Sequence, residues 1–308
     1  MIPIKVENIH KNYGEIKALK GVGFQVNEGE IFGLIGPDGA GKTTLMRMIV
    51  SLLFPDEGNI LFMDRDVVSN NAFVRSHVGY MPQRFSLYQD LSVEENLLFF
   101  GDLFNVPKEK QHQRLERLYN FSRLGPFKKR FAGALSGGMK QKLALSCMLM
   151  HEPEIMILDE PTFGVDPVSR LEFWNILGTL RDQGITQVIS TPYMDEAARC
   201  DRIALIYAGN ILALDAPDKI IADFPYNIYK IASEVPHILF NNLKSVMEEK
   251  DIQLFADGVH VIDRNKMGIN EMRNFLKAYL KDDEEPAQSN ANLENIFLDL
   301  MHEQKEQV

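Results

Sequence analysis

The chain has 308 residues, of which 45% are hydrophobic and 25% are charged, and its formal net charge is −10. This length and apolar content suffice for one large α/β domain and a smaller second domain. The acidic balance argues against nucleic acid as a partner. No uncharged apolar run reaches the roughly 18–20 residues of a membrane-spanning helix, and the N-terminus lacks the layout of a signal peptide. We therefore expect a cytoplasmic chain that does not cross a membrane by itself.

Two strands are predicted before the first glycine-rich loop. Ile2–Ile9 alternates apolar and polar residues, as an edge strand of a half-exposed sheet would, and Ala18–Val26 follows as a second strand. Between them stands Tyr13. Such an aromatic ahead of a phosphate-binding loop could stack on an adenine ring, and the alternative is a tyrosine that only packs at a strand end.

The motif GPDGAGKTT, Gly36–Thr44, lies between the apolar run Ile31–Ile35 and the helical pattern Leu45–Leu53. It matches the phosphate-binding pattern G-x-x-x-x-G-K-[ST] in its strand–loop–helix setting. Its glycines let successive backbone N–H groups face phosphate oxygens, and the helix N-terminus adds partial positive charge. We expect Lys42 to reach the β- and γ-phosphates and Thr43 to offer its hydroxyl to Mg²⁺. The predicted nucleotide-binding residues here are Tyr13, Gly36, Pro37, Asp38, Gly39, Ala40, Gly41, Lys42, Thr43 and Thr44.

A short strand is predicted over His77–Pro82, and it runs into Gln83. The carbonyl oxygen of a glutamine at such a strand end can ligate Mg²⁺ or hold the attacking water. Beyond it, Ser92 and Glu95 have the spacing of a capping box at the start of a helix. We predict a helical subdomain over about residues 84–150.

Near the end of this helical region, LSGGMKQ places Ser136, Gly137 and Gly138 at the start of a helix. The exposed N–H groups, the helix dipole and the serine hydroxyl could form a second anion site. An ordinary N-cap with a flexible turn is the alternative.

The apolar run Ile155–Leu158 predicts a buried central strand that ends in Asp159 and Glu160. Carboxylates at the C-terminal end of such a strand lie beside the phosphate loop in doubly wound sheets. We expect Asp159 to hold Mg²⁺ through water and Glu160 to act as general base on the hydrolytic water. The predicted catalytic residues are thus Glu160, Gln83 and Lys42, and the predicted metal-binding residues are Thr43, Gln83 and Asp159.

Beyond about Ala216 the pattern still alternates between strands and helices, but it carries no glycine loop and no group of acids. We predict a nucleotide-binding domain over residues 1–225 and a small α+β accessory domain over residues 226–308. Within the latter, Lys281–Gln288 is predicted to be an acidic linker and Leu293–Met301 a closing amphipathic helix.

In this order and spacing the motifs resemble the nucleotide-binding domain of ATP-binding cassette (ABC) transporters, over about Ile2–Leu214. The resemblance rests on five motifs: Walker A GPDGAGKTT, the glutamine loop at Gln83, the signature LSGGMKQ, Walker B IMILDE and the D-loop Gly164–Asp166. It implies an α/β P-loop cassette with a mixed core sheet, an antiparallel β subdomain and a helical subdomain. The tail NLENIFLDLM is similar to the C-terminal extension of multidrug exporter ATPases of the daunorubicin-resistance type.

The resemblance also implies ATP and Mg²⁺ as cofactors and a second cassette as partner, either identical or non-identical. Each ATP would lie between Walker A of one cassette and the signature, here Ser136–Gly138, of the other. The opening and closing of the pair would act on a separate membrane permease through a groove near Gln83–Asp90. We accordingly expect an exporter ATPase at the cytoplasmic face of the membrane.

One residue departs from the family pattern: Pro192 stands where a histidine usually contacts the γ-phosphate. Proline offers neither a side-chain donor nor an N–H. Loss of a charge-assisted hydrogen bond of roughly 1.5–3 kcal/mol would slow hydrolysis on the order of 10- to 100-fold. We therefore hypothesise a non-identical partner cassette. The rival function is a soluble ABC ATPase that acts on ribosomes or DNA, which the single cassette, the short interval Thr44–Leu135 and the acidic charge disfavour.

Overall fold

The computed structural model describes residues 2–84, 87–281 and 284–306 and divides into two compact units, Met1–Ala216 and Pro217–Val308. Each unit has its own hydrophobic core. The second unit begins with α8 (Pro217–Ala222), and the predicted domain limit at residue 225 falls just after this helix. The units are described separately below.

A six-stranded sheet of order β10-β9-β3-β8-β7-β6 forms the centre of the first unit. Its neighbours are parallel, except that β10 runs antiparallel to β9. Every residue of β3, β7 and β8 is buried, as expected for parallel strands that are covered on both faces. Their carboxyl ends therefore meet at one edge of the sheet. The strands are β3 (Ile31–Ile35), β6 (Val78–Met81), β7 (Ile155–Asp159), β8 (Thr186–Thr191), β9 (Arg202–Tyr207) and β10 (Asn210–Asp215).

A second, antiparallel sheet of the first unit has the order β2-β1-β4-β5. The prediction that Ile2–Ile9 is an edge strand is wrong, because β1 pairs with β2 on one side and with β4 on the other. An alternating pattern reports that one face of a strand is polar, but it carries no information about how many of its edges are hydrogen-bonded. The strands are β1 (Ile4–Tyr13), β2 (Ile16–Val26), β4 (Glu57–Phe62) and β5 (Arg65–Asp66).

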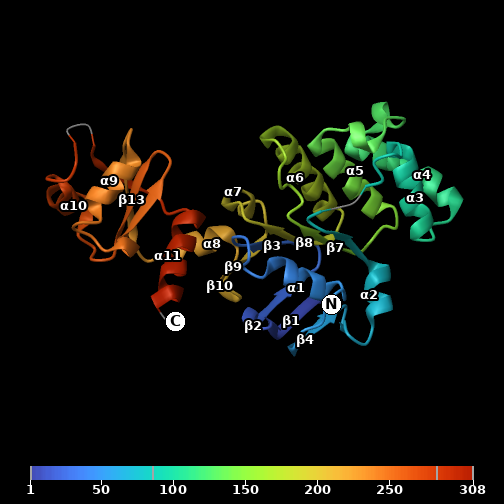
Figure 1. Ribbon diagram of the computed structural model, residues 1–308, viewed down its shortest axis with the longest axis horizontal. Helices are drawn as coiled ribbons and strands as arrows, with labels where there is room; N and C mark the ends of the chain where they lie inside the picture. Colours follow the sequence, from blue (N-terminus) through green and yellow to red (C-terminus); the bar gives the residue numbers. More distant parts are fainter. Residues whose placement is uncertain (1, 85–86, 282–283, 307–308) are drawn as a thin grey trace. The chain divides into compact units, whose positions relative to one another are not determined.

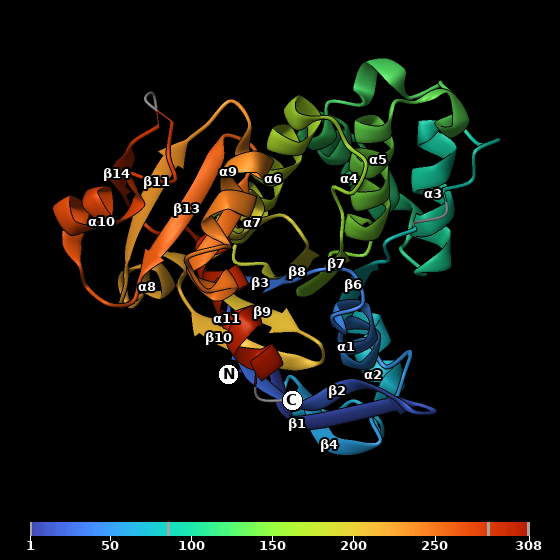
Figure 2. The ribbon, with the colours of Figure 1, turned by 60° about the vertical axis from the view of Figure 1, so that its left-hand side comes forward.

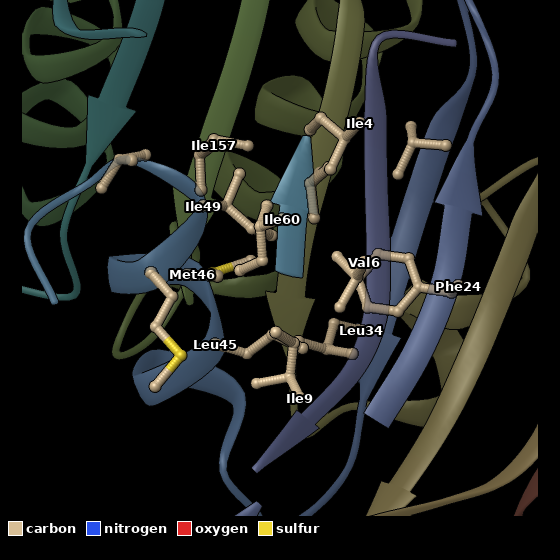
Figure 3. Packing of buried hydrophobic residues seen from close by; sticks show 14 of the residues in the cluster. Ile4, Val6, Ile9, Phe24, Leu34, Leu45, Met46, Ile49, Ile60 and Ile157 are labelled. Carbon is tan, nitrogen blue, oxygen red and sulfur yellow. The ribbon is translucent and has the colours of Figure 1, made fainter. Parts of the chain in front are cut away.

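Helix α1 (Lys42–Ile49) is held by the apolar core between these two sheets. Figure 3 shows Leu45, Met46 and Ile49 of this helix among side chains of both sheets, including Ile60 and Ile157. Burying an aliphatic side chain of this size contributes about 1.5–3 kcal/mol. Because α1 begins directly after the phosphate loop, this packing anchors the C-terminal end of the loop.

The other helices of the first unit are α2 (Asn71–His77), α3 (Val93–Leu103), α4 (Lys108–Ser122), α5 (Gly137–Leu149), α6 (Pro167–Asp182) and α7 (Met194–Ala197). Figure 1 shows α3, α4 and α5 side by side, in the region predicted to be helical. The predicted capping box is present: the Ser92 hydroxyl accepts a hydrogen bond from Glu95 N, and the Glu95 carboxylate accepts one from Ser92 N. Among the described residues, no helix is both long enough and apolar enough to span a bilayer.

Between α8 and α11, the second unit has the order β-α-β-β-α-β. Its sheet is β12-β13-β11-β14 with antiparallel neighbours, which is the ferredoxin-like arrangement. Figure 2 shows α9 and α10 beside the strands, and their apolar side chains share one core with them. On β13 and β12, His260 and Gln253 hydrogen-bond to Asn295 of α11. The elements are β11 (Asn227–Ala232), α9 (Pro236–Leu243), β12 (Ile252–Phe255), β13 (Gly258–Asp263), α10 (Gly268–Leu276), β14 (Pro286–Ser289) and α11 (Leu293–Glu306).

The predicted acidic linker Lys281–Gln288 is partly wrong. Its residues 282 and 283 lie outside the described residues, but Pro286–Ser289 forms β14, which pairs with β11 at the edge of the sheet. Proline is tolerated in an edge strand, since it lacks only one ladder donor there. Part of the polar segment that suggested a linker therefore belongs to β14, a short edge strand of the sheet.

Candidate nucleotide-binding site

The phosphate loop, residues 36–41, connects the buried strand β3 to α1. Its first residue must be glycine for a steric reason: a Cβ on Gly36 would lie 2.1 Å from the backbone oxygen of Ile206 on β9. At its other end the loop is tied to the turn before β10, because Gly209 N donates to Ala40 O at 3.1 Å. The loop is thus shaped by tertiary contacts as well as by its own glycines.

Lys42 places its ammonium inside this loop. Its Nζ donates to Gly36 O at 2.7 Å and to Pro37 O at 3.0 Å, and it lies 3.1 Å from Glu160 Oε1. Both charged side chains of this ion pair are only 4% exposed. The predicted phosphate-binding lysine and the predicted general base are therefore in direct contact.

Glu160 also contacts the third predicted catalytic residue, since Gln83 Nε2 donates to Glu160 Oε2 at 2.7 Å. Gln83 follows β6, Glu160 follows β7 and Lys42 follows the loop after β3, so parallel strands bring the three together at one sheet edge. The backbone φ of Glu160 is +48°, in the left-handed region. Such a conformation costs a non-glycine residue on the order of 1 kcal/mol or more and is concentrated at functional sites.

Ser190, to which the sequence pattern assigns no role, contacts both acids of the candidate site. Its hydroxyl donates to Asp159 Oδ1 at 2.6 Å and accepts from Glu160 N at 2.9 Å. It is fully buried near the end of β8, the strand beside β7. A serine directly after the apolar pair Val188-Ile189 was the available signal, but its significance depends on which strand is its neighbour.

The residues predicted to hold Mg²⁺ fit a cation. Asp159 Oδ2 is buried and has no hydrogen-bond partner among the described residues, although burying a carboxylate oxygen without one is costly. A hard anionic oxygen of this kind suits Mg²⁺, which takes one or two protein oxygens together with substrate phosphates. No group of three or more His, Cys, Asp or Glu in residues 2–84, 87–281 and 284–306 could hold a metal ion by itself. Thr43, the second residue of α1, would add a hydroxyl.

The signature segment lies at the start of α5. The Ser136 hydroxyl accepts from Met139 N at 3.4 Å, which confirms the N-cap, while Ser136 and Gly137 are exposed. Gly138 packs against α6, where a Cβ would lie 2.5 Å from Ser169 Oγ. Asp166 of the D-loop caps α6 by accepting from Ser169 N at 2.9 Å. An anion site at this helix start stays a prediction.

Known proteins resemble this chain along nearly its whole length. The family model described as "ABC transporter" matches residues 19–163. Nod factor export ATP-binding protein I of Burkholderia orbicola (strain AU 1054) is 34% identical over 300 residues, which are 97% of this chain and 96% of that protein. The chain belongs to the ATP-binding cassette family of transporter ATPases. The resemblance and the fold class predicted from the sequence are confirmed.

Another relative and two solved structures similar to this chain are also ABC proteins. The probable multidrug ABC transporter ATP-binding protein YbhF of Escherichia coli (strain K12) is 42% identical over 219 residues, 71% of this chain, but the match spans only 38% of that protein. The structure of CbiO1 from Clostridium perfringens, part of the ABC transporter complex CbiONQ, has a TM-score of 0.66 at 27% identity, covering 72% of this chain and 91% of that one. A dimeric post-hydrolysis cassette bound to ADP and Pi has a TM-score of 0.63 at 26% identity, covering 69% and 98%.

Tyr13 lies at the end of β1 with 48% of its side chain exposed, and its ring centroid is 6.0 Å from Lys11 Nζ. The adjacent strand β2 is connected to the phosphate loop through Gly209. Lys20 N of β2 donates to Gly209 O, and Gly209 N donates to Ala40 O of the loop. A tyrosine that served only packing would be more deeply buried. Adenine stacking by Tyr13 remains a prediction with this geometry in its favour.

Pro192 follows β8 directly and is partly buried. The neighbouring Thr191 hydroxyl accepts from Tyr193 N at 3.1 Å and donates to Glu196 Oε2 at 2.6 Å. The loop that carries the family's histidine position is therefore held in place although the histidine is missing.

Proposed function

We propose that this cassette is the ATP-hydrolysing subunit of an ABC exporter. The observation that carries the proposal is the contact of Lys42, Gln83 and Glu160 beside the phosphate loop, with Asp159 next to them. A cationic phosphate ligand, a water-positioning amide and a buried carboxylate are the parts that phosphoryl transfer to water requires.

In the proposed reaction, Lys42 exchanges Glu160 for the β- and γ-phosphate oxygens when ATP enters the loop. Glu160, released from this ion pair, accepts a proton from the attacking water while the water oxygen bonds to the γ-phosphorus and the bond to ADP breaks. Gln83 holds the water or the metal through its amide oxygen. Mg²⁺, held by Asp159, Thr43 and Gln83, would neutralise charge on the phosphates. Ser190 holds the Asp159 carboxylate and the backbone N–H of Glu160 in place throughout.

Exposed residues support the proposed partners. We propose that the cassette acts with a separate membrane subunit at the cytoplasmic face; no helix among its described residues could itself span a bilayer. Tyr88 and Leu103 are exposed, and Tyr88 packs on Phe99 of α3, which supports docking of that subunit near the predicted groove Gln83–Asp90. Residues 85 and 86 of the groove lie outside the described residues. The exposed Ser136–Gly137 supports a shared site with a second cassette.

The names of the relatives favour export over a soluble role, since they are ATP-binding proteins of a multidrug transporter and of Nod factor export. We propose a drug-like or lipid-like organic cargo for this chain as well. The ribosome- or DNA-linked alternative has no support from these relatives.

The proposed ATPase is tested with Glu160→Gln, which keeps size and removes the base. We expect Mg-ATP binding to remain and turnover to fall about 10²- to 10⁴-fold, the usual contribution of a general base. Glu57→Gln, an exposed position on β4, is the matched control and should keep wild-type turnover. Wild-type turnover in Glu160→Gln would contradict the assignment of the base.

The proposed asymmetry is tested with Pro192→His. If Pro192 weakens this Walker site, the variant should hydrolyse ATP on the order of 10- to 100-fold faster than the wild-type chain alone. Addition of a candidate non-identical cassette should raise turnover of the wild-type chain. Full activity of the wild-type chain alone, unchanged by Pro192→His, would exclude an asymmetric pair.

A further inference from the structure

A buried carboxylate outside the predicted site joins two of its loops. Glu196 in α7 is 1% exposed. Its Oε1 accepts from Thr162 Oγ1 at 2.7 Å, and its Oε2 accepts from Thr191 Oγ1 at 2.6 Å. Thr162 comes two residues after Glu160, and Thr191 ends β8 next to Ser190. One side chain therefore bridges the segments that follow β7 and β8.

The same carboxylate is the counter-ion of Arg170 on α6. Arg170 Nε lies 3.7 Å from Glu196 Oε1, and the guanidinium lies 4.4 Å from the ring centroid of Tyr193. Arg170 directly follows Ser169, the residue on which Gly138 of the signature packs. A continuous set of contacts thus leads from the segment after Glu160 to the start of α5.

This arrangement has a specific physical consequence. A carboxylate taken out of water is tolerated only when hydrogen bonds and an opposite charge compensate for its lost hydration. Glu196 receives one hydroxyl from each loop and a partial counter-charge from α6. Displacing either loop would leave part of that charge uncompensated, so the two loops are constrained to move together.

We propose that Glu196 is a positioning residue for ATP hydrolysis: it locks the Glu160 segment to the loop after β8 and, through Arg170, to the signature helix. The inference rests on the proposed role of Glu160 as general base. Glu196 contacts neither the phosphate loop nor Lys42 in the hydrogen bonds and ion pairs described for it, so its loss affects the placement of the base more than the binding of ATP.

The test compares Glu196→Gln with Asp195→Asn in the full chain, with kcat measured at saturating Mg-ATP and the ATP Kd measured by equilibrium binding. Asp195 is the neighbouring acid, 73% exposed, and also faces Arg170. Misplacement of a reacting group by about 1 Å can cost on the order of 100-fold in rate, so we expect Glu196→Gln to lower kcat roughly 10- to 100-fold. We expect its ATP Kd to stay near the wild-type value and Asp195→Asn to behave as wild type.

Two further variants separate positioning from folding. Thr191→Val keeps the shape of the side chain and removes the hydroxyl, whereas Thr191→Ser keeps it. The expected result is a lowered kcat with unchanged Kd for Thr191→Val and near-wild-type hydrolysis for Thr191→Ser. Equal hydrolysis by these two variants, or equal hydrolysis by Glu196→Gln and Asp195→Asn, overturns the inference while the proposed function stands. Absence of hydrolysis by the wild-type chain, alone and with a second cassette, overturns both.

Discussion

Replacing Ser190 by alanine removes the hydroxyl that joins the two acids of the candidate site. The Glu160 N–H keeps a second acceptor, the backbone oxygen of Ser190 at 3.2 Å. Asp159 has no such reserve, because its Oδ1 loses the 2.6 Å donor and its Oδ2 has no partner among the described residues. The substitution therefore leaves a fully buried carboxylate with neither oxygen hydrogen-bonded to a described residue.

The size of the effect follows from the charge on the acceptor. A hydrogen bond to an ionised group contributes about 1.5–3 kcal/mol, against about 0.5–1.5 kcal/mol for a neutral pair. For a unit of this length, each kcal/mol corresponds to roughly 2–4 °C in Tm, so Ser190→Ala should lower Tm by roughly 3–12 °C. Hydrolysis should fall as well, because Ser190 also holds the Glu160 backbone.

Thermal unfolding followed by circular dichroism measures this, with Ser146→Ala as the matched control. Ser146 is equally buried, but its hydroxyl donates to the backbone oxygen of Lys142 within α5, a neutral acceptor. Alanine also favours a helix more than serine does, so we expect a Tm change of only a few degrees or less. If both variants melt at the same temperature, Ser190 does not support a charged Asp159 and the account of the site is wrong.

Three other outcomes follow from the structure. Gly36→Ala, whose new Cβ would clash with backbone, should abolish ATP binding and lower the free energy of unfolding by about 1–3 kcal/mol. Gly39→Ala, whose Cβ would lie in open space, should lower it by only about 1 kcal/mol through φ strain. Nucleotide titration measures the binding and thermal melting measures the stability. Tyr13→Ala should raise the Kd for ATP about 5- to 150-fold and Tyr13→Phe should not, as stacking contributes about 1–3 kcal/mol per base. Burial lowers the pKa of His260 below its usual 6.5, so the unfolded state binds more protons as pH falls; the part of the second unit's stability that depends on neutral His260 is complete above pH 6.5 and is lost progressively below it. Amide hydrogen exchange of β12 and β13 in the full chain would detect this loss, and stability that increased on acidification would contradict it.

The amino-acid pattern alone predicts the family and the chemical groups of the candidate site. Gly36–Thr44, the signature at Ser136–Gly138 and the strand ending in Asp159-Glu160 could each be read locally, because a phosphate loop, a helix cap and a buried strand end are built from contiguous residues. The capping box at Ser92 could be predicted from the sequence for the same reason.

How these groups come into contact depends on the order of the strands in the folded sheet. Gln83 and Glu160 are 77 positions apart and Asp159 and Ser190 are 31 apart, and both pairs are in contact because β6, β7 and β8 are neighbours in the sheet. Strand order depends on packing over the whole unit, and no local pattern encodes it. For the same reason the interior position of β1 and the bridge made by Glu196 could not be predicted from the sequence. The residues proposed to do the chemistry can be recognised from local sequence patterns, whereas the residues proposed to position them can be recognised only from the fold.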